Sequence, residues 1–459
     1  MSAAPAASLF KAYDVRGRFG RELTETAMHA IARAFGSELR ARGFRRVALG
    51  CDGRLSSPVL HRAAAEGLMA AGVQVLDVGL VPTPLLYFAA HEAADGCGLM
   101  VTGSHNPPDY NGAKFVLGGG ALAGAEVQAL RTRLLHGDLA RGGGEIHPLP
   151  LAPHYHARIS DTLRLARPLR VVVDSGNGAA GPHAGPLLAA LGCEVHALHA
   201  EVDGNFPNHH PDPSEPHNLR DLIAAVERVG ADIGLAFDGD ADRLGVVIPG
   251  GEIIWPDRLL ILFARDLLAR HPGAEVIYDV KCSGHLRRAV AAAGGRPVMW
   301  RTGHSVMKAR MRETGALLGG ELTGHFFFAE GWYGFDDGLY AAARLLELLS
   351  RHEAAPAQVL SALPRGVTTP ELRLPLAEEV AAALMERVLA AAHRLGGAAN
   401  DLDGLRVDYP DGWGLVRASH TTPSLVFRFE GDDEAALLRV QARFRALLLD
   451  LEPSLAIPF

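Results

Sequence analysis

The chain has 459 residues, a formal net charge of −7 and 48% hydrophobic residues. This hydrophobic content supports folded cores and excludes a wholly disordered chain, and the length predicts roughly three domains. The acidic balance argues against a general nucleic-acid-binding surface, which would be basic. The sequence has no run of about 18 or more apolar residues, so we expect no membrane-spanning helix.

The N-terminal stretch "MSAAPAASLFKAYD" lacks a charged start followed by a long apolar core, so we expect no secretory signal. The four cysteines are far apart in the sequence and form no CxxC pair: Cys51, Cys97, Cys193 and Cys282. Free thiols in a cytoplasmic protein are the simplest interpretation of this spacing.

Lysine is rare among the 45 basic residues, because only Lys11, Lys114, Lys281 and Lys308 are lysines. A lysine that persists against this arginine bias indicates a position where a compact ammonium cannot be exchanged for a guanidinium. Chance is the alternative explanation. We apply the argument mainly to Lys114 and Lys281.

Three segments share one pattern of strand, polar turn, amphipathic helix, glycine and second strand. They span residues 45–79, 169–199 and 274–303, and their first strands end near Asp52, Asp174 and Asp279, respectively. The pattern predicts a βαβ unit with a parallel strand pair in each segment.

Glycine- and proline-rich joints at 141–150, 247–253 and 363–371 separate these copies from each other and from the C-terminal part. The C-terminal part differs, because one long helical segment at 377–395 precedes strands and a last helix. We therefore expect an α/β protein with three related α/β domains and a smaller α+β domain. The expected domain boundaries are 1–150, 151–250, 251–364 and 365–459.

In the first copy, residues 99–114 read "LMVTGSHNPPDYNGAK" and place Ser104 directly after an apolar run. The Gly, Asn, Pro and Asp residues around it are typical of an ordinary turn. They would also stiffen a loop that presents a nucleophilic hydroxyl. The segment alone leaves both interpretations open.

In the second copy, "GNGAAG" at 176–181 matches the G-x-G-x-x-G pattern of dinucleotide-binding folds, with Glu201 about 20 residues further on. Asp174 would then lie beside a pyrophosphate, and the other two copies lack the pattern. These two points disfavour a nicotinamide or flavin site. The chain also has no Gly-Lys dipeptide and therefore no Walker A motif.

Further along this copy, "LAFDGDADRLG" at 235–245 places Asp238, Asp240 and Asp242 two residues apart behind an apolar run. Converging carboxylates repel one another, so they need a cation or full solvation, and oxygen ligands favour a hard ion such as Mg²⁺. An EF-hand is excluded, because its sixth and twelfth positions would be Arg243 and Pro249. A solvated acidic turn is the alternative.

The remaining polar clusters are ambiguous when each is taken alone. Glu321 and Thr323 in "GGELTGHFFF" could bind vicinal sugar hydroxyls or could form a strand edge beside a buried His325. His304 lies in a glycine turn, where core packing is an equal alternative. The segment "VRASHTTPSL" could form a phosphate cradle or an ordinary loop, and its candidate residues are Arg417, Ser419, His420 and Thr421.

The motifs taken together resemble those of the α-D-phosphohexomutase superfamily, and most of all its bacterial phosphomannomutase/phosphoglucomutase branch. They occur in this order along the chain: "KAYDVRG", "TGSHNPPDYNG", "DGDADR", "GELTGH" and "RASHTTP". The resemblance covers essentially the whole chain. It implies four domains around a central cleft.

By this resemblance, Ser104 carries a phosphoryl group, and one Mg²⁺ per chain binds Asp238, Asp240, Asp242 and a phosphoserine oxygen. A phosphoserine brings about two negative charges, and the metal would neutralise them as a sugar hydroxyl approaches. Arg243 would stabilise charge on the transferring group.

The implied activity is a phosphohexomutase that interconverts hexose 1-phosphate and 6-phosphate through a 1,6-bisphosphate, with glucose or mannose 1,6-bisphosphate as activator. The implied partner is a small phosphosugar, bound by a cytoplasmic monomer without nucleic acid or membrane. Glu321 and Thr323 match sugar-hydroxyl contacts, and Arg417, Ser419 and Thr421 match a distal phosphate loop. The remaining matches lie near the reacting groups: Tyr13, Arg16, His105, Lys114, Lys281, His304 and His325.

Two residues depart from the family pattern. Thr323 stands where serine is usual, and His420 stands where asparagine is usual. Both changes could alter substrate preference or pH behaviour. A phosphoglucosamine mutase is the alternative within the superfamily. A nucleotide-dependent oxidoreductase and a non-catalytic sugar-phosphate-binding protein are the alternatives outside this activity.

Overall fold

The computed structural model describes residues 5–419 and 423–459. The chain forms two compact units, and each contains several separate segments of the sequence. The first unit comprises Met1–Pro256, His304–Leu317 and Thr323–Ser361. The second unit comprises Asp257–Gly303, Leu318–Leu322 and Ala362–Phe459.

The first sheet of the first unit is mixed and has the strand order β1-β5-β4-β2-β3-β7, with β6 paired to β5. Its strands are β1 (Val15–Arg18), β2 (Arg46–Cys51), β3 (Gln74–Leu80), β4 (Gly98–Val101), β5 (Tyr110–Leu117), β6 (Gly120–Ala121) and β7 (Ile146–Pro148). Strands β2, β3, β4 and β7 run parallel, whereas β5 is antiparallel to its partners β1, β4 and β6. The predicted parallel pair of the first repeat is therefore confirmed.

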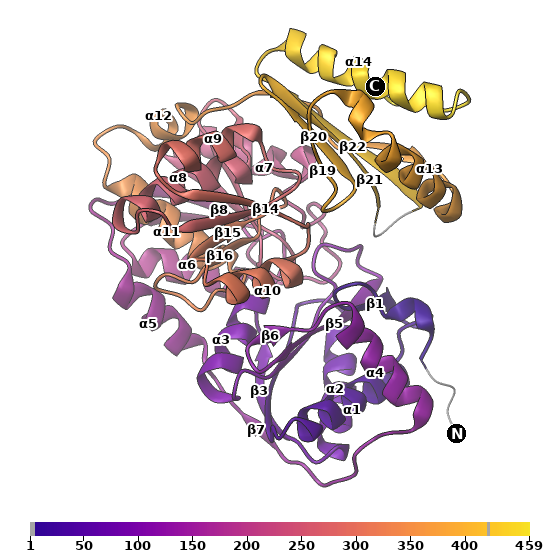
Figure 1. Ribbon diagram of the computed structural model, residues 1–459. Helices are drawn as coiled ribbons and strands as arrows, with labels where there is room; N and C mark the ends of the chain where they lie inside the picture. The colour runs from indigo at the N-terminus through magenta and orange to yellow at the C-terminus, as the bar shows by residue number, and fades with distance from the viewer. Residues whose placement is uncertain (1–4, 420–422) are drawn as a thin grey trace. The chain divides into compact units, whose positions relative to one another are not determined.

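The helices of this region are α1 (Glu25–Ala41), α2 (Ser57–Ala70), α3 (Thr83–Ala93) and α4 (Ala125–His136), with a short 3-10 turn at Ala7–Leu9. Helices α1, α2 and α4 pack with the sheet around one apolar core (Figure 1). Gly67 of α2 allows α1 to approach closely, because a Cβ at this position would lie 2.3 Å from the carbonyl oxygen of His29.

The second sheet has the strand order β12-β11-β10-β8-β9. Its strands are β8 (Arg170–Asp174), β9 (Glu194–Leu198), β10 (Ile233–Phe237), β11 (Leu244–Ile248) and β12 (Glu252–Ile254). Strand β8 is parallel to β9 and β10, so the second predicted repeat is confirmed. Strands β11 and β12 are antiparallel, so the glycines of the predicted joint at 247–253 form a hairpin turn inside this sheet.

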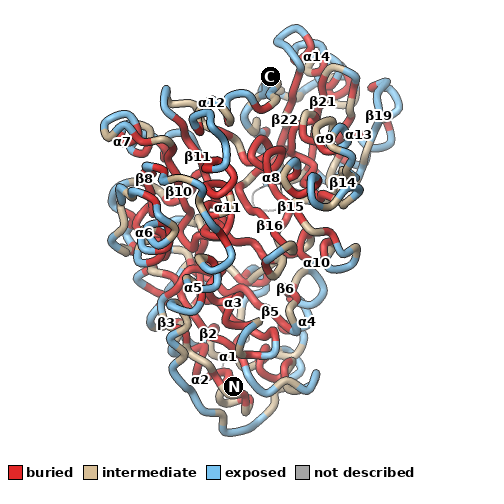
Figure 2. The backbone as a smooth tube through the Cα atoms, turned by 90° about the vertical axis from the view of Figure 1, so that its left-hand side faces the viewer, coloured by how far each residue is buried: buried red, intermediate tan, exposed pale blue. Residues whose placement is uncertain are grey.

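The first unit contains further helices and short segments. They are α5 (Ala152–Thr162), α6 (Gly181–Ala190), α7 (Arg220–Val229), α10 (His304–Thr314), α11 (Gly338–Ser350) and α12 (Pro356–Ser361), with a 3-10 turn at Pro216–Leu219 and the strand β16 (Phe326–Phe328). Strands β10 and β11 are buried along their whole length and are drawn in red in Figure 2.

The second unit contains the third predicted repeat. Strand β13 (Glu275–Asp279) is parallel to both β14 (Arg296–Trp300) and β15 (Leu318–Gly320), which confirms the parallel pairing. The helices of this part are α8 (Pro256–Arg270) and α9 (Gly284–Ala292).

The C-terminal sheet of the second unit is antiparallel, with the strand order β17-β22-β21-β20-β19 and β18 paired to β22. Its elements are β17 (Val367–Thr368), β18 (Leu372–Pro375), α13 (Glu378–Ala390), a 3-10 turn (Ala392–Leu395), β19 (Ala398–Asn400), β20 (Leu405–Tyr409), β21 (Gly412–Ala418), β22 (Ser424–Gly431) and α14 (Glu434–Leu451). Helices α13 and α14 share one apolar core with the sheet. The predicted α+β character is confirmed, although the long predicted helix is interrupted after Ala390.

Among the residues that the structure describes, none of the helices combines the length and the apolar composition needed to cross a membrane.

The close packing of α1 on α2 gives a test of the fold. We expect Gly67→Ala to lower the stability of the first unit by about 1–3 kcal/mol, since the added methyl meets backbone atoms that cannot move freely. Gly143→Ala is the matched control, because no atom lies within 4 Å of a Cβ built on this exposed glycine. Calorimetric unfolding of both variants measures the difference, and equal midpoints would contradict the packing argument.

Candidate active site

Ser104 follows β4 in the first unit and has a left-handed backbone conformation with φ of +50°. Such a conformation is uncommon for a residue with a Cβ and therefore needs support from its surroundings. The backbone N–H of Ser104 donates to the Thr102 hydroxyl at 2.8 Å. The Ser104 hydroxyl is buried and lies 3.3 Å from both Asp238 Oδ2 and His105 Nδ1.

Arg54 binds the backbone of this loop, although it was not predicted from the sequence. Its side chain is only 1% exposed, and its guanidinium donates to four backbone carbonyl oxygens of the loop. These acceptors are Ser104, Asn106, Pro107 and Tyr110, at 2.6–3.0 Å. Asp52 balances its charge at 3.2 Å. The only sequence signal was the polar turn after the first strand of the repeat.

Arg16, a predicted site residue, holds the same loop from β1. Its Nη1 donates to the Gly103 carbonyl at 2.7 Å and to Asn106 Oδ1 at 2.5 Å, while Asp14 pairs with the other end of the guanidinium. Two arginines therefore fix the backbone that carries Ser104.

Asp238, Asp240 and Asp242 lie in the turn between β10 and β11, and all three are fully buried. One oxygen from each carboxylate lies within 4.8 Å of the others. Asp240 Oδ1 and Asp242 Oδ1 have no hydrogen-bond partner among the described residues. Buried carboxylate oxygens without a partner are costly, so the group fits a hard cation that binds oxygen ligands.

Lys114 of β5 compensates part of this charge, since its Nζ lies 2.7 Å from Asp240 Oδ2 and 2.5 Å from Asp242 Oδ2. Burial would lower the pKa of Lys114, but the two carboxylates raise it well above its usual range. Burial also raises the pKa of Asp238 well above its usual range, and the Asp242 and Asp240 carboxylates raise it further. The three carboxylates thus need more positive charge than Lys114 supplies.

Arg243 lies directly after the triad and points its guanidinium toward several predicted residues. Its Nε is 3.0 Å from His325 Nε2 and 3.8 Å from Asp238 Oδ2, and its Nη1 is 3.7 Å from Asp212 Oδ1. Burial would lower the pKa of Arg243, but Asp212 and Asp238 raise it. The guanidinium is therefore a fixed positive charge beside Asp238 and Asp212.

Asp336, which was not predicted from the sequence, lies between the predicted His304 and His325 and close to both. Its carboxylate lies 3.2 Å from His325 Nδ1, 3.4 Å from His304 Nδ1 and 2.6 Å from Lys308 Nζ. Burial lowers the pKa of His304 well below its usual range, and the Lys308 ammonium lowers it further. The ring of Tyr13 lies 6.5 Å from that of His304, so these predicted residues form one cluster in the first unit.

His105 is the neighbour of Ser104 and can exchange a proton with it. Burial lowers the pKa of His105 well below its usual range, and the Arg243 guanidinium lowers it further. The imidazole is therefore neutral near pH 7 and can accept a proton at 3.3 Å from the Ser104 hydroxyl.

Other predicted residues lie in the second unit. Lys281 Nζ is 3.5 Å from Glu371 Oε2, and Arg417 Nη1 is 3.5 Å from Asp403 Oδ1. Glu321 accepts a 2.5 Å hydrogen bond from the Gly303 N–H, and the Ser419 N–H donates to the Ser424 carbonyl. All of these side chains are buried or half-buried.

Thr323 is half-buried and belongs to the first unit, two residues before His325. The predicted His420 and Thr421 lie outside the described residues.

The glycines of "GNGAAG" have a structural role in the first unit. The Ala179 N–H donates to the Gly239 carbonyl at 3.0 Å, and a Cβ on Gly178 would lie 2.7 Å from the same oxygen. The glycine-rich turn therefore packs against the loop that carries Asp238 and Asp240. This packing explains Gly178 without a dinucleotide.

Four domain families of phosphoglucomutase/phosphomannomutase match successive parts of the chain. The alpha/beta/alpha domains I, II and III match residues 7–140, 154–251 and 255–366, and the C-terminal domain matches residues 371–447.

Two relatives show the same similarity over almost their full length. A phosphomannomutase/phosphoglucomutase of Pseudomonas aeruginosa is 53% identical, over 99% of this chain and 98% of its own. A phosphoglucomutase of Neisseria gonorrhoeae is 51% identical, over 96% of each chain. The crystal structure of a phosphoglucomutase/phosphomannomutase family protein from Burkholderia thailandensis superposes with a TM-score of 0.95 at 51% identity, covering 99% of this chain and all of its own. The chain therefore belongs to the phosphoglucomutase/phosphomannomutase family of hexose phosphate mutases.

Proposed function

We propose that the enzyme transfers a phosphoryl group between Ser104 and a hexose phosphate, with one Mg²⁺ per chain held by Ser104, Asp238, Asp240 and Asp242. The observation that carries the proposal is the position of the Ser104 hydroxyl, 3.3 Å from Asp238 Oδ2 in a buried carboxylate group in which two oxygens accept no hydrogen bond. A hard divalent cation fits that donor set. When bound, it would neutralise negative charge on the phosphoserine and on the transferred group.

In the first half of the reaction, a hydroxyl of the hexose monophosphate attacks the phosphorus of phosphorylated Ser104. The bond between phosphorus and Ser104 Oγ breaks, and a hexose 1,6-bisphosphate forms. Arg243 lies close enough to the triad to stabilise negative charge on the transferring group. His304, whose pKa is lowered by burial, and His325 both lie beside Asp336 and are our candidates for the base that accepts the proton of the attacking hydroxyl.

In the second half, the other phosphate of the bisphosphate returns to Ser104. The Ser104 hydroxyl must then lose its proton, and His105 Nδ1 at 3.3 Å is the proposed acceptor. Lys114 would hold Asp240 and Asp242 in place throughout, and Arg16 would fix the loop. The two half-reactions together exchange the 1- and 6-phosphates without net consumption of bisphosphate.

The substrates that we propose are glucose and mannose phosphates, because the two relatives named above are a phosphomannomutase/phosphoglucomutase and a phosphoglucomutase. A glucose or mannose 1,6-bisphosphate would restore phosphate to an unphosphorylated Ser104. Proposed contacts to the sugar and its distal phosphate come from Tyr13, Lys281, Glu321, Thr323, Arg417, Ser419, His420 and Thr421. Preference for glucosamine phosphate is the competing assignment.

We propose four domains with boundaries near residues 150, 250 and 364, and each domain contains at least one candidate motif. We also propose a cytoplasmic monomer. The four cysteines, all free and buried, agree with a reducing compartment.

The phosphoserine gives the first test. We expect part of the purified enzyme to carry one phosphate on Ser104, which intact-mass and peptide mass spectrometry detect. Ser104→Ala should lose this phosphate and reduce kcat by at least about a thousandfold, the order seen when a covalent nucleophile is removed. Full activity of a completely dephosphorylated enzyme without added bisphosphate would rule out the scheme.

Lys114 provides a second test. Lys114→Arg should fold but lower kcat on the order of a hundredfold, because a guanidinium cannot occupy the buried position of the ammonium without displacing Asp240 or Asp242. The matched control is Lys11→Arg, because Lys11 is exposed. Steady-state rates with glucose 1-phosphate compare them, and a wild-type rate for Lys114→Arg would show that the site does not need a compact ammonium.

A further inference from the structure

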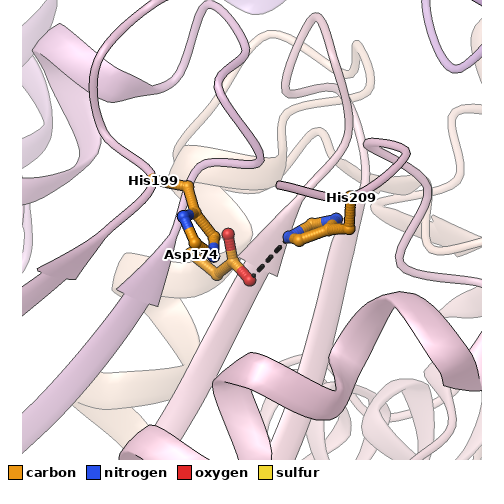
Figure 3. A group of neighbouring side chains, drawn as sticks. All are labelled: Asp174, His199 and His209. Carbon is orange, nitrogen blue, oxygen red and sulfur yellow. Dashed lines mark hydrogen bonds and ion pairs between the residues drawn. The ribbon is translucent and has the colours of Figure 1, made fainter. Parts of the chain in front are cut away.

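A second cluster of metal-ligating side chains lies in the first unit, at the carboxyl ends of two neighbouring strands of the second sheet. Asp174 ends β8, His199 directly follows β9, and His209 comes from the long connection to α7 (Figure 3). One ligand atom of each residue lies within 4.8 Å of the others. None of these residues belongs to the proposed phosphoryl-transfer site.

The hydrogen bonds of His209 restrict its protonation. Its Nδ1 lies 3.0 Å from the His210 carbonyl oxygen, which only accepts hydrogen bonds, so Nδ1 carries a proton. Its Nε2 lies 3.0 Å from Asp174 Oδ2, which is a second acceptor (Figure 3). The ring is therefore either a doubly protonated imidazolium or a metal ligand through Nε2.

The surroundings of His209 favour the metal. His199 brings a second imidazole beside that of His209, with ring centroids 5.3 Å apart, and one of its ring nitrogens lies within 4.8 Å of the ligand atoms of Asp174 and His209. Two imidazoles and a carboxylate form a common ligand set for zinc.

Partners outside the cluster orient both rings as is usual at metal sites. The His210 carbonyl orients His209, and Asp221 Oδ2 lies 3.3 Å from His199 Nε2. Asp174 is buried, and its Oδ1 accepts a 2.9 Å hydrogen bond from the Gly176 N–H, which leaves Oδ2 directed at His209. The two histidines are partly exposed, so an ion can enter from solvent.

The spacing suits a small transition-metal ion. Ligand atoms at about 2.1 Å from a tetrahedral zinc ion lie about 3.4 Å from one another. The pair Asp174 Oδ2 and His209 Nε2 is already at 3.0 Å, and the remaining ligand atoms lie within 4.8 Å. Modest side-chain rotation therefore closes the group around one ion.

We propose that Asp174, His199 and His209 bind a divalent transition-metal ion of the zinc type, with a further coordination position open to water. Magnesium is disfavoured here because it prefers oxygen ligands. The bound ion would also fix the segment that leads from His209 to Asp212, whose carboxylate lies 3.7 Å from Arg243. The site is thus separate from the Asp238 group but joined to it by a short piece of chain.

Cobalt(II) is the probe for this site, because it replaces zinc and absorbs visible light. We titrate metal-stripped full-length enzyme with Co²⁺ in saturating Mg²⁺, which occupies oxygen-ligand sites. The wild type should bind one equivalent with the visible bands of a four- or five-coordinate ion. His199→Asn and His209→Gln should weaken binding at least about tenfold.

The variants are chosen to preserve the fold. Asparagine tolerates the left-handed backbone of His199, whose φ is +48°, and glutamine can still donate to Asp174. His196→Asn, an exposed histidine on β9, is the matched control and should bind Co²⁺ like the wild type. Circular dichroism checks that each variant is folded.

A crystal soaked with Zn²⁺ gives a measurement that needs no variant, since an anomalous peak between the three side chains supports the site. Failure of the wild type to bind Co²⁺ in Mg²⁺ would overturn the proposal, as would equal affinity in the folded ligand variants. Asp174 and His209 would then be an imidazolium–carboxylate pair. Either result leaves the assignment of Ser104 untouched.

Discussion

The burial of several carboxylates in one small region is the constraint on which the first unit depends. Asp238, Asp240 and Asp242 are fully buried in one turn, and Asp336 is fully buried near them. Like charges held this closely in a poorly solvated interior destabilise the fold unless cations compensate them. The positions of Lys114, Arg243 and Lys308 follow from that requirement. The Asp240 and Asp242 oxygens that accept no hydrogen bond leave a place for a divalent cation.

The same requirement explains how Ser104 is presented. Its loop passes over the carboxylates with a left-handed residue at the serine, and such a loop would not hold its shape by itself. Arg54 and Asp52, which are buried together, bind the loop from below through its carbonyl and amide groups. The chain thus fixes the nucleophile by backbone hydrogen bonds and leaves the hydroxyl available for chemistry.

The sequence revealed those parts of the fold and site that have a local signature. The three parallel strand pairs appear as repeats of one short pattern, and Ser104 and the Asp238 group stand in compact motifs after apolar strands. The antiparallel strands β5 and β11 were not predicted, because their pairing is decided by partners elsewhere in the chain. Arg54 was not predicted for the same reason, because the Ser104 carbonyl to which it donates lies 50 residues further along the chain.

Asp336 and Asp212 were not predicted from the sequence, because neither stands in a recognisable motif. Asp212 contacts Arg243, and Asp336 contacts His304 and His325, and these partners lie elsewhere in the chain. The glycines at 176–181 are a motif for which the sequence already disfavoured a nucleotide site. They match a dinucleotide motif, but each has a structural reason: Gly178 packs against Gly239, Gly181 packs against the Ala200 carbonyl, and Gly176 has a φ of +51°. A short glycine motif therefore indicates that something packs closely against the backbone. It does not show whether that is a ligand or another part of the chain.

Magnesium binding tests the central claim most directly, since the account requires one divalent cation on Ser104 and the three aspartates. Calorimetric titration of the metal-stripped enzyme should give one Mg²⁺ per chain. Asp240→Asn should weaken that binding at least about tenfold, whereas Asp161→Asn on the exposed surface of α5 should leave it unchanged. Unaltered magnesium affinity in folded Asp240→Asn would contradict the account, because the buried carboxylates would then serve something other than a cation.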